Sequence, residues 1–462
     1  MALPDAVSRA LYRAYCVASP WYRAGQLGRW RRVLQEAETW QPSEIDAFQR
    51  RLLRRLLVQA RTAPFYSRRL AEGGIDPDAC ELGDLRRLPV LTKAEINADP
   101  GAFYVERPPR YRAGASSGTT GAPLRVRTTA AMDAAARAAR WRMFGWYGIT
   151  FGARILAFKG GNQTRNAALA ASWFLARTAL GQTLRDAFRF PLQENLDLLA
   201  RERPQVVLGY PNVLVELVAG ASSRGFTLSE LGVRLVVLGG ESIAEAQRER
   251  IGAAFRAPVV ALYGSHEGHY MAMECPRGRL HVQETVLLEV VDAQGRAAKE
   301  GEEGEVVITP LLGTALPLLR YQLGDRGRKL GPCPCGRPTP TLALDLCRIA
   351  DMFALSDGRR ISSQLFQPMI HNAFGLRFGV DPTHYRVVQL SPDRFEFQLV
   401  LPGGNALPPG AEAFVGERVR AALGPGVTVR AIGVKALCPD DSGKRRCFIP
   451  LNEAERFRLT IE

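Results

Sequence analysis

The sequence contains no uninterrupted run of the roughly 18 apolar residues that a membrane-spanning helix needs. Its most apolar stretch, residues 206–220, is broken by Pro211 and Glu216. The pattern of a signal peptide is also missing, because Asp5 and Arg9 interrupt the N-terminal region early. We therefore expect a cytoplasmic protein without a membrane span.

Internal repeats and long low-complexity tracts are absent too, which argues against a repeat array or a largely disordered chain. A chain of 462 residues is long enough for two or more domains with complete hydrophobic cores. Its hydrophobic fraction of 46% and charged fraction of 23% are ordinary for a globular protein.

One stretch of small and hydroxylated residues cannot contribute to a core. It consists of Ser116, Ser117, Gly118, Thr119, Thr120 and Gly121. Such a run can bend tightly, bring backbone N–H groups close to a ligand and add hydroxyl donors, as a phosphate-binding loop must. No lysine follows Gly121, and the three-glycine dinucleotide pattern is missing. A flexible linker, or a hairpin turn before the strand-like residues 123–129, is the alternative.

The formal net charge is +15 at pH 7. The basic residues are scattered, with the highest density between Arg50 and Arg69 on a stretch with helical spacing. Zinc-finger and aromatic RNA-binding signatures are lacking. A solvated basic face together with a small anionic substrate such as ATP explains the charge better than a nucleic-acid partner, which we do not expect.

Apolar stretches alternate with helical patterns along the first half of the chain. Strands are predicted at 154–158, 203–211, 233–241 and 257–264, and helices within 1–72, at 129–146 and near 165–180. Continuous apolar strands of this kind indicate a parallel sheet covered on both faces, with ligands at the carboxyl ends of the strands. Short strands at 287–292, 304–309 and 317–321 then predict an antiparallel lobe, followed by an α+β region.

Five motifs occur in a fixed order along the sequence. They are the 116–121 loop, Gly239-Gly240-Glu241, Tyr263-Gly264-Ser265-His266-Glu267-Gly268, Arg320-Tyr321-Gln322-Leu323-Gly324-Asp325 and Gly443-Lys444. With them the chain resembles the adenylate-forming superfamily of acyl-CoA synthetases, adenylation domains and luciferases. Glu274-Cys275, Gly278-Arg279-Leu280-His281 and Cys333-Pro334-Cys335-Gly336-Arg337 make it most similar to the phenylacetate–CoA ligase branch, including its capsule-biosynthesis-like members.

The resemblance implies an α/β fold in two parts. Residues 1–347 would form a large N-terminal adenylation domain of parallel-sheet subdomains plus a β-rich lobe, and residues 348–462 a small mobile α+β C-terminal domain. It also implies a two-step reaction, in which a carboxylate attacks the α-phosphate of ATP and the resulting acyl adenylate transfers its acyl group, usually to CoA.

The motifs then suggest roles for individual residues in ATP binding. The 116–121 loop would hold the β- and γ-phosphates, although Ala122 replaces a lysine common in the family. Glu267 would bind Mg²⁺, since a hard cation prefers carboxylate oxygen. By resemblance, Tyr263 stacks on adenine and Asp325 binds the ribose hydroxyls. Gly240, Glu241 and Gly264 would also bind ATP. Ser265, which stands where the family often has threonine, would be catalytic.

The resemblance also suggests roles for Lys444 and Arg348 and a place for the acid. Lys444 would contact the reacting carboxylate, and Arg348 would be the hinge arginine, although Ala350 replaces the aspartate expected after it. The acid would lie against Tyr210, Pro211 and Gly239.

The acceptor of the acyl group stays open. Residues 357–362 depart from the glycine-rich stretch of typical phenylacetate–CoA ligases. An amine or hydroxyl acceptor is therefore an alternative to CoA, and a homodimer is not excluded. A catalytically dead nucleotide- or nucleic-acid-binding protein is the alternative from another class, but Glu267, Asp325 and Lys444 argue against it.

The cysteines suggest a metal rather than disulfides, because disulfides are rare in cytosolic proteins. Cys275, His281, Cys333 and Cys335 supply the three thiolates and one imidazole of a closed tetrahedral zinc site. Similar residues in the branch suggest a structural Zn²⁺ that joins two loops. The alternative is a set of free cysteines in a reducing compartment.

Overall fold

The computed structural model of the protein describes most of the chain. The described residues are 26–115, 124–159, 182–186, 190, 192–240, 243, 245–348, 352–362, 366, 370, 374–380, 382, 384–402, 406–437, 446–451 and 454. The predicted helix near 165–180 lies outside these residues, as does the first part of the predicted N-terminal helical region.

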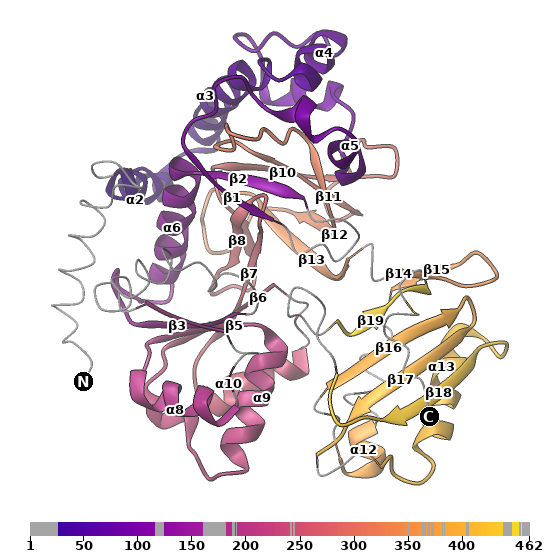
Figure 1. Ribbon diagram of the computed structural model, residues 1–462. Coiled ribbons are helices and arrows are strands. Elements are labelled where there is room, and N and C mark those ends of the chain that lie inside the picture. The colour runs from indigo at the N-terminus through magenta and orange to yellow at the C-terminus, as the bar shows by residue number, and fades with distance from the viewer. Residues whose placement is uncertain are drawn as a thin grey trace.

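Short helices form the N-terminal part of the fold (Figure 1). They are α2 (Gln26–Glu36), η1 (Ala37–Thr39), α3 (Pro42–Ala60), α4 (Pro64–Glu72), η2 (Leu82–Arg87), α5 (Lys93–Ala98) and η3 (Pro100–Phe103). The leucines of α3 recur at helical spacing, so Leu53, Leu56 and Leu57 are buried while arginines between them face outward. Thr92 caps α5 in a capping box with Glu95.

The parallel strands form one half of a large mixed sheet. They are β3 (Ile155–Lys159), β4 (Gln182–Asp186), β5 (Val206–Gly209), β6 (Leu235–Gly239) and β7 (Val259–Ser265). On one face lie α2 and α6 (Ala130–Gly145). On the other lie α8 (Leu192–Glu202), α9 (Pro211–Ser222) and α10 (Glu245–Phe255). Because both faces are covered, the inner strands β5 and β6 are apolar along their whole length, and the prediction of a covered parallel sheet is confirmed.

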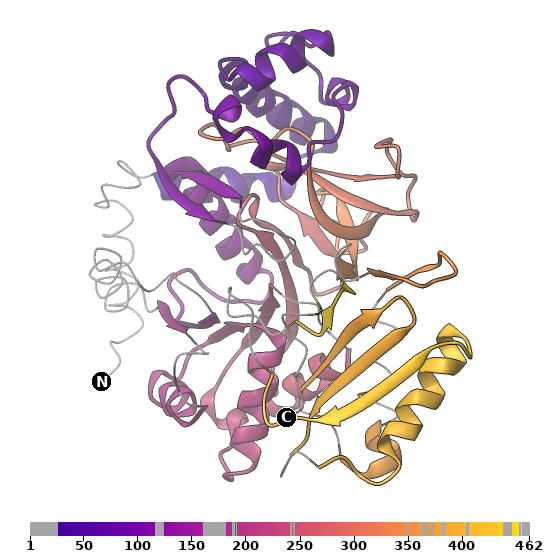
Figure 2. The same ribbon diagram turned by 45° about the vertical axis from the view of Figure 1, so that its right-hand side comes forward.

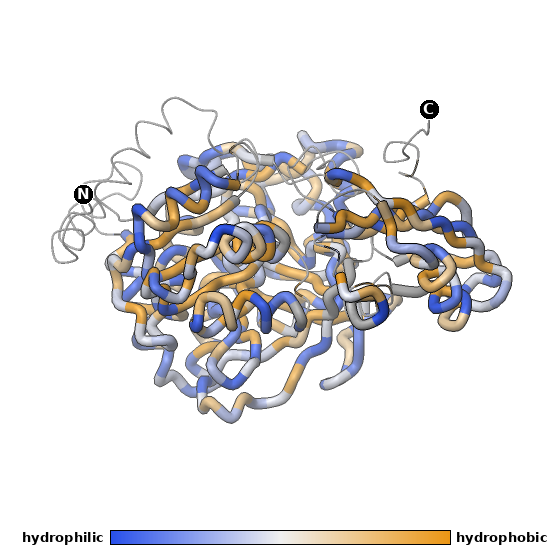
Figure 3. The backbone as a smooth tube through the Cα atoms, turned by 90° about the horizontal axis from the view of Figure 1, so that it is seen from below, coloured by the Kyte–Doolittle hydropathy of each residue, from blue (hydrophilic) through white to orange (hydrophobic). Residues whose placement is uncertain are grey.

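The antiparallel strands continue this same sheet instead of forming a separate layer. They are β8 (His269–Glu274), β9 (Leu280–Val282), β10 (Val286–Val291), β11 (Glu303–Pro310), β12 (Tyr321–Leu330) and β13 (Thr341–Arg348). Within the described residues the order is β10-β11-β12-β13-β9-β8-β7-β6-β5-β3-β4. Apolar strands therefore run through the middle of the molecule, with hydrophilic turns around them (Figure 3).

The strand predicted at 317–321 is wrong in its bounds, because β12 begins only at Tyr321. Arg320 has a left-handed φ of 50° and is 2% exposed. Its backbone N–H donates to the Thr309 hydroxyl, so the chain turns sharply here before it enters the sheet. A buried arginine with this conformation cannot be foreseen from an apolar pattern.

A separate hairpin carries the predicted phosphate loop. Its strands are β1 (Tyr111–Ala115) and β2 (Arg125–Thr129), and their register pairs Ala115 with Arg125. The segment between these two residues contains the loop, whose residues lie outside those described.

The C-terminal part has its own sheets and core. β14 (Met352–Ala354) pairs with β15 (Arg360–Ser362), and a second sheet has the order β18-β17-β16-β19. Its strands are β16 (His384–Ser391), β17 (Arg394–Val400), β18 (Thr428–Gly433) and β19 (Phe448–Ile449). The short α12 (Phe374–Phe378) and the longer α13 (Ala411–Leu423) pack with them (Figure 2). No helix within the described ranges is both long and apolar enough to cross a membrane.

Candidate functional site

The residues predicted to contact the acid lie where two parallel strands, β5 and β6, end. β6 ends at Gly239, and Tyr210 directly precedes α9. Gly240 has φ +81°, and a Cβ atom there would lie 2.6 Å from Cε1 of Tyr210. A Cβ atom on Gly239 would lie 2.6 Å from the Leu262 carbonyl oxygen. Both glycines are therefore required by close packing, and the Tyr210 ring lies against the backbone of Gly240. Pro211, the third predicted pocket residue, is the first residue of α9.

The turn from β7 to β8 carries the central motif. Ser265 accepts a hydrogen bond from the Gly268 N–H at 2.9 Å, which fixes the turn. A side chain on Gly264 would collide with the His269 carbonyl oxygen, so only glycine fits there. His269 has φ 56°, and its Nε2 lies 3.2 Å from the Thr128 hydroxyl. That contact joins the turn to the β1–β2 hairpin.

The two residues predicted to bind the nucleoside lie in contact. The Tyr263 hydroxyl donates to Oδ2 of Asp325 at 2.8 Å, from a strand 62 residues earlier in the chain. Asp325 is 8% exposed and pairs in register with Arg348 on β13. Gly324, with φ +80°, lies directly before Asp325 inside β12, where the pairing with β11 is irregular. The phenol therefore orients the carboxylate, a group that can accept hydrogen bonds from more than one donor.

Glu267 lies in a narrow, largely buried pocket. The side chain is 9% exposed, and the pocket is also lined by Arg127, Thr128 and His266. Burial raises the pKa of Tyr321, and the nearby Glu267 carboxylate raises it further. A buried carboxylate within reach of the phosphate-loop hairpin suits a hard divalent cation, because such cations prefer oxygen ligands.

Some predicted site residues lie outside the described part of the chain. These are Ser116, Ser117, Gly118, Thr119, Thr120, Gly121, Glu241 and Lys444. Arg348 is described as the last residue of β13, but its side chain is not. The structure therefore brings together Tyr210 with Gly240, and Tyr263 with Asp325, while the roles of all these residues remain predictions.

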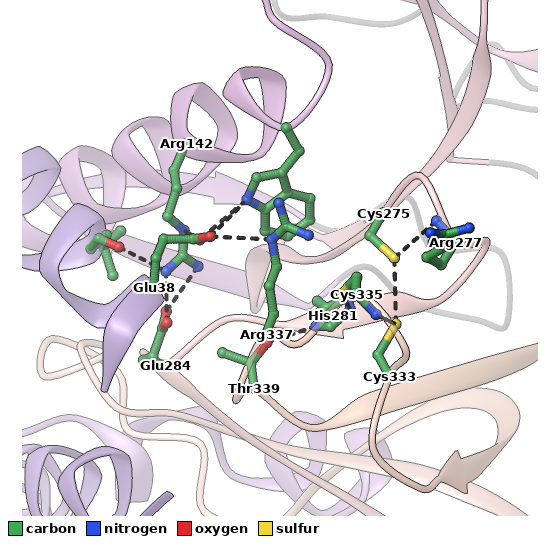
Figure 4. A network of polar contacts seen from close by, with 12 residues as sticks. Glu38, Arg142, Cys275, Arg277, His281, Glu284, Cys333, Cys335, Arg337 and Thr339 are labelled. Atoms are coloured by element: carbon green, nitrogen blue, oxygen red, sulfur yellow. Dashed lines mark hydrogen bonds and ion pairs between the residues drawn. The ribbon is translucent and has the colours of Figure 1, made fainter. Parts of the chain in front are cut away.

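The four predicted metal ligands converge, as Figure 4 shows. The ligand atoms of Cys275, His281, Cys333 and Cys335 all lie within 4.8 Å of one another. The Cys275 and Cys333 sulfurs are 3.7 Å apart, and the Cys335 sulfur lies 3.2 Å from Nε2 of His281. With zinc–sulfur bonds of about 2.3 Å, the edge of a tetrahedral thiolate site is about 3.8 Å, which matches the sulfur pair.

A hydrogen bond orients the His281 ring toward the three thiols. Nδ1 of His281 lies 2.9 Å from the Thr339 hydroxyl, which leaves Nε2 to face the thiols. Burial lowers the pKa of His281 to about 4, and Arg337 and Arg142 lower it too. These effects favour the neutral imidazole, which is the form that binds metal ions.

Sequence reasoning missed the residues around these ligands. Thr339 sits four residues after Cys335, Trp146 comes from the end of α6, and Glu38 comes from η1. Arg337 belongs to one of the motifs quoted above, but its partners Glu38 and Trp146 belong to none of them. No spacing rule links Glu38 to residues about 300 positions away, so only the folded chain reveals this contact.

Comparison with known proteins agrees with this geometry. Residues 116–310 match the family described as AMP-binding enzyme. The phenylacetate-coenzyme A ligase of Thermus thermophilus is 31% identical over 341 residues, which cover 69% of this chain and 74% of that protein. Protein CapK of Staphylococcus aureus is 22% identical over 270 residues, 57% of this chain and 58% of CapK.

Solved structures show the same fold. The 2-hydroxyisobutyryl-CoA ligase in its postadenylation state, with 2-HIB-AMP, matches with a TM-score of 0.70 and 22% identity, covering 91% of this chain and 93% of that one. The amide bond synthetase McbA of Marinactinospora thermotolerans gives a TM-score of 0.51 at 22% identity, over 75% of this chain and 68% of its own.

The identity and coverage shared with the Thermus enzyme extend well beyond the motifs themselves. The match to the AMP-binding enzyme family begins at Ser116 and includes the second and third motifs, so it also fits an enzyme that activates carboxylates with ATP. The chain therefore belongs to the phenylacetate–CoA ligase family of adenylate-forming enzymes, and it is an ATP-dependent carboxylate ligase that forms an acyl adenylate and then transfers the acyl group.

Proposed function

We propose that this ligase activates an aryl or closely related carboxylic acid and transfers the acyl group to CoA. The observation that carries the proposal is the Tyr210 ring held against Gly240, next to the strand end where Tyr263 meets Asp325. An aromatic wall there suits a flat apolar acid, and curated relatives at 26% to 31% identity carry the name phenylacetate-coenzyme A ligase.

The residues divide the work of the first step. Tyr263 stacks on adenine, Asp325 accepts hydrogen bonds from the ribose hydroxyls, and the 116–121 loop binds the β- and γ-phosphates. Glu267 would hold Mg²⁺, which neutralises phosphate charge when bound. A carboxylate oxygen then attacks the α-phosphorus, the bond to the bridging oxygen breaks, and pyrophosphate leaves with both electrons of that bond.

The second step needs a nucleophile. The CoA thiol, after losing its proton, attacks the adenylate carbonyl, and AMP leaves. We assign residues 1–347 to the adenylation domain and residues 348–462 to a C-terminal domain that carries Lys444 and turns about Arg348 between the steps. The enzyme would work in the cytoplasm, where CoA and ATP are available.

An amine or hydroxyl acceptor is the second candidate. Residues 357–362 replace the glycine-rich stretch of typical family members, and here they form the turn and second strand of the β14–β15 hairpin, with Gly358 at φ +83°. Such an acceptor would require every adenylation residue but no groove for CoA.

The test is carboxylate-dependent exchange of labelled pyrophosphate into ATP across a panel of aryl and alkyl acids. We expect exchange with at least one aryl acid, and release of a thioester when CoA is then added. Exchange followed by transfer of the acyl group to hydroxylamine or amines, but not to CoA, would show that the acceptor is an amine and not CoA. Exchange with alkyl acids alone would overturn the aryl assignment.

We also propose a structural Zn²⁺ bound by Cys275, His281, Cys333 and Cys335. The donor set fits, because three thiols and a neutral imidazole converge at separations close to those of a tetrahedral site. Four protein ligands leave no open position, so the ion would join the loops and take no part in the reaction.

Protein purified without chelators should therefore contain about one zinc per chain. Cys333→Ser should lower that content sharply and reduce thermal stability, because the ion binds only the folded state. Cys80→Ser is the matched control, since Cys80 is also a buried free cysteine but belongs to a core cluster that contains none of these ligands. Full-length folded protein without any transition metal, even after refolding with zinc, would contradict the proposal.

A further inference from the structure

Glu38 is a point where three distant parts of the chain meet (Figure 4). Its carboxylate accepts from Nε1 of Trp146 at 3.2 Å and from Nε of Arg337 at 3.1 Å. Nε of Arg142 lies 3.3 Å away. Trp146 and Arg142 come from the end of α6, and Arg337 comes from the loop that carries Cys333 and Cys335.

Two of these partners continue to the metal ligands. The Arg337 guanidinium lies over the Trp146 ring, 4.3 Å from its centroid. The edge of that ring meets His281, with centroids 5.6 Å apart and planes at 71°. Arg337 follows Cys335 by two residues, across the left-handed turn at Gly336. Glu38 therefore fixes the groups that pack directly on the imidazole and at the end of the cysteine loop.

The third partner anchors Glu38 itself. Arg142 makes a two-pronged ion pair with Glu284, with N–O distances of 2.6 and 2.9 Å. The same guanidinium donates to the Leu34 carbonyl of α2 at 3.0 Å. Arg142 is 7% exposed and Glu284 is fully buried. An ion pair this buried is costly to break from one side, because the remaining charge loses its partner in a low-dielectric site.

The charges explain why this arrangement suits a metal site. A divalent ion bound by three thiolates leaves about one net negative charge on the site. Arg337 brings a positive charge next to the loop that carries Cys333 and Cys335, and Glu38 holds this guanidinium in place by accepting from its Nε at 3.1 Å. Without Glu38 the arginine keeps its charge but loses its orientation.

We propose that Glu38 is a positioning residue for the metal site, and that it couples metal binding to the docking of the α2–η1 segment. The proposal rests on the zinc site proposed above. Coupling between two equilibria is reciprocal, so metal binding stabilises the docked helix by the same free energy with which the docked helix strengthens metal binding. A purely structural Glu38 would hold α2 without affecting the metal.

The test compares Glu38→Gln with Glu36→Gln in the full-length zinc-loaded protein. Glu36 is exposed and lies in the same segment, but none of the contacts described above involves its side chain. Its replacement therefore removes the same charge without changing the contacts of Trp146, Arg142 or Arg337. The chelator 4-(2-pyridylazo)resorcinol reports zinc release. We expect Glu38→Gln to weaken zinc retention about 10-fold, which is the lower end of the loss seen when a group that supports metal ligands is removed. Glu36→Gln should leave zinc retention unchanged.

A spectroscopic readout separates positioning from stability. In Co²⁺-substituted protein, Glu38→Gln should shift the thiolate-to-cobalt absorption bands, because the ligands change orientation, whereas Glu36→Gln should not. Trp146→Phe, which keeps a ring but removes the N–H donor, gives the same comparison if Glu38→Gln does not fold. Hydrogen exchange of residues 26–39 should accelerate when zinc is removed from the otherwise unchanged protein.

The outcomes separate the two proposals. Wild-type protein that binds neither zinc nor cobalt overturns the metal site and this inference with it. Wild-type protein that binds zinc while Glu38→Gln and Trp146→Phe match the Glu36→Gln control overturns only the coupling.

Discussion

Glu267→Gln should lower carboxylate-dependent pyrophosphate exchange by about 10²–10³-fold, the cost of removing one main electrostatic contact in a site where charge develops. Glutamine keeps the volume of the side chain and one carbonyl oxygen, so the pocket around residue 267 should stay packed. It loses the charge that attracts a divalent cation. The measurement is the exchange rate at saturating acid, as a function of Mg²⁺ and ATP.

The loss should be in part recovered at high Mg²⁺, since the carbonyl oxygen of glutamine still binds the ion weakly. Glu249→Gln provides the control, because Glu249 is exposed on α10. An unchanged exchange rate in Glu267→Gln, together with an unchanged Mg²⁺ requirement, would assign the cation to another ligand.

The parallel half of the sheet could be predicted because each of its inner strands is a short run of consecutive apolar residues in the sequence. Strands such as 235–239 are apolar at every position, since helices cover both faces, and turn residues follow at once. The antiparallel strands were recognised too, but not their continuity with the parallel half. That continuity depends on the pairing of β7 with β8, a tertiary fact that single-strand patterns do not contain. The strand start at Tyr321 was missed because the buried Arg320 breaks the pattern.

Sequence motifs single out candidate site residues, but they do not predict which distant residues contact one another in the fold. Tyr263 and Asp325 were each expected to bind the nucleoside, but their hydrogen bond spans 62 residues and follows only from the order of strands in the sheet. The four residues proposed as metal ligands were singled out by their spacing and chemistry, and the structure places their ligand atoms within 4.8 Å of one another. Glu38 and Trp146 were not singled out, because a carboxylate in a short helix and a tryptophan at a helix end have many ordinary roles.

Lys444→Ala should separate the two half-reactions. We expect pyrophosphate exchange to fall by about 10²-fold or more, because a cation that contacts the reacting carboxylate acts only in the first step. Acyl transfer from preformed, isolated acyl adenylate should change by less than about threefold, as expected for a residue absent from that transition state. Both rates are measured in single-turnover experiments, so that product release does not mask the difference.

The structure gives a reason to expect this split. Lys444 lies outside the described residues, but β19 begins at Phe448 and pairs in parallel with Val387 and Val388 of β16. Phe448 and Ile449 are almost completely buried, so the chain just after the lysine is firmly attached to the C-terminal sheet. Our proposal for Lys444 therefore requires the C-terminal domain to face the sheet that carries Glu267 and Asp325 during the first step.

Arg445→Ala distinguishes this lysine from its basic neighbours. If Lys444 were one more solvated charge in a run with Arg445 and Arg446, both substitutions would have the same small effect on exchange, which depends on overall charge and is screened by salt. A large loss confined to Lys444→Ala, and insensitive to salt, requires a contact at the reacting group. An equal loss in both half-reactions would instead assign Lys444 to the stability or the movement of the C-terminal domain.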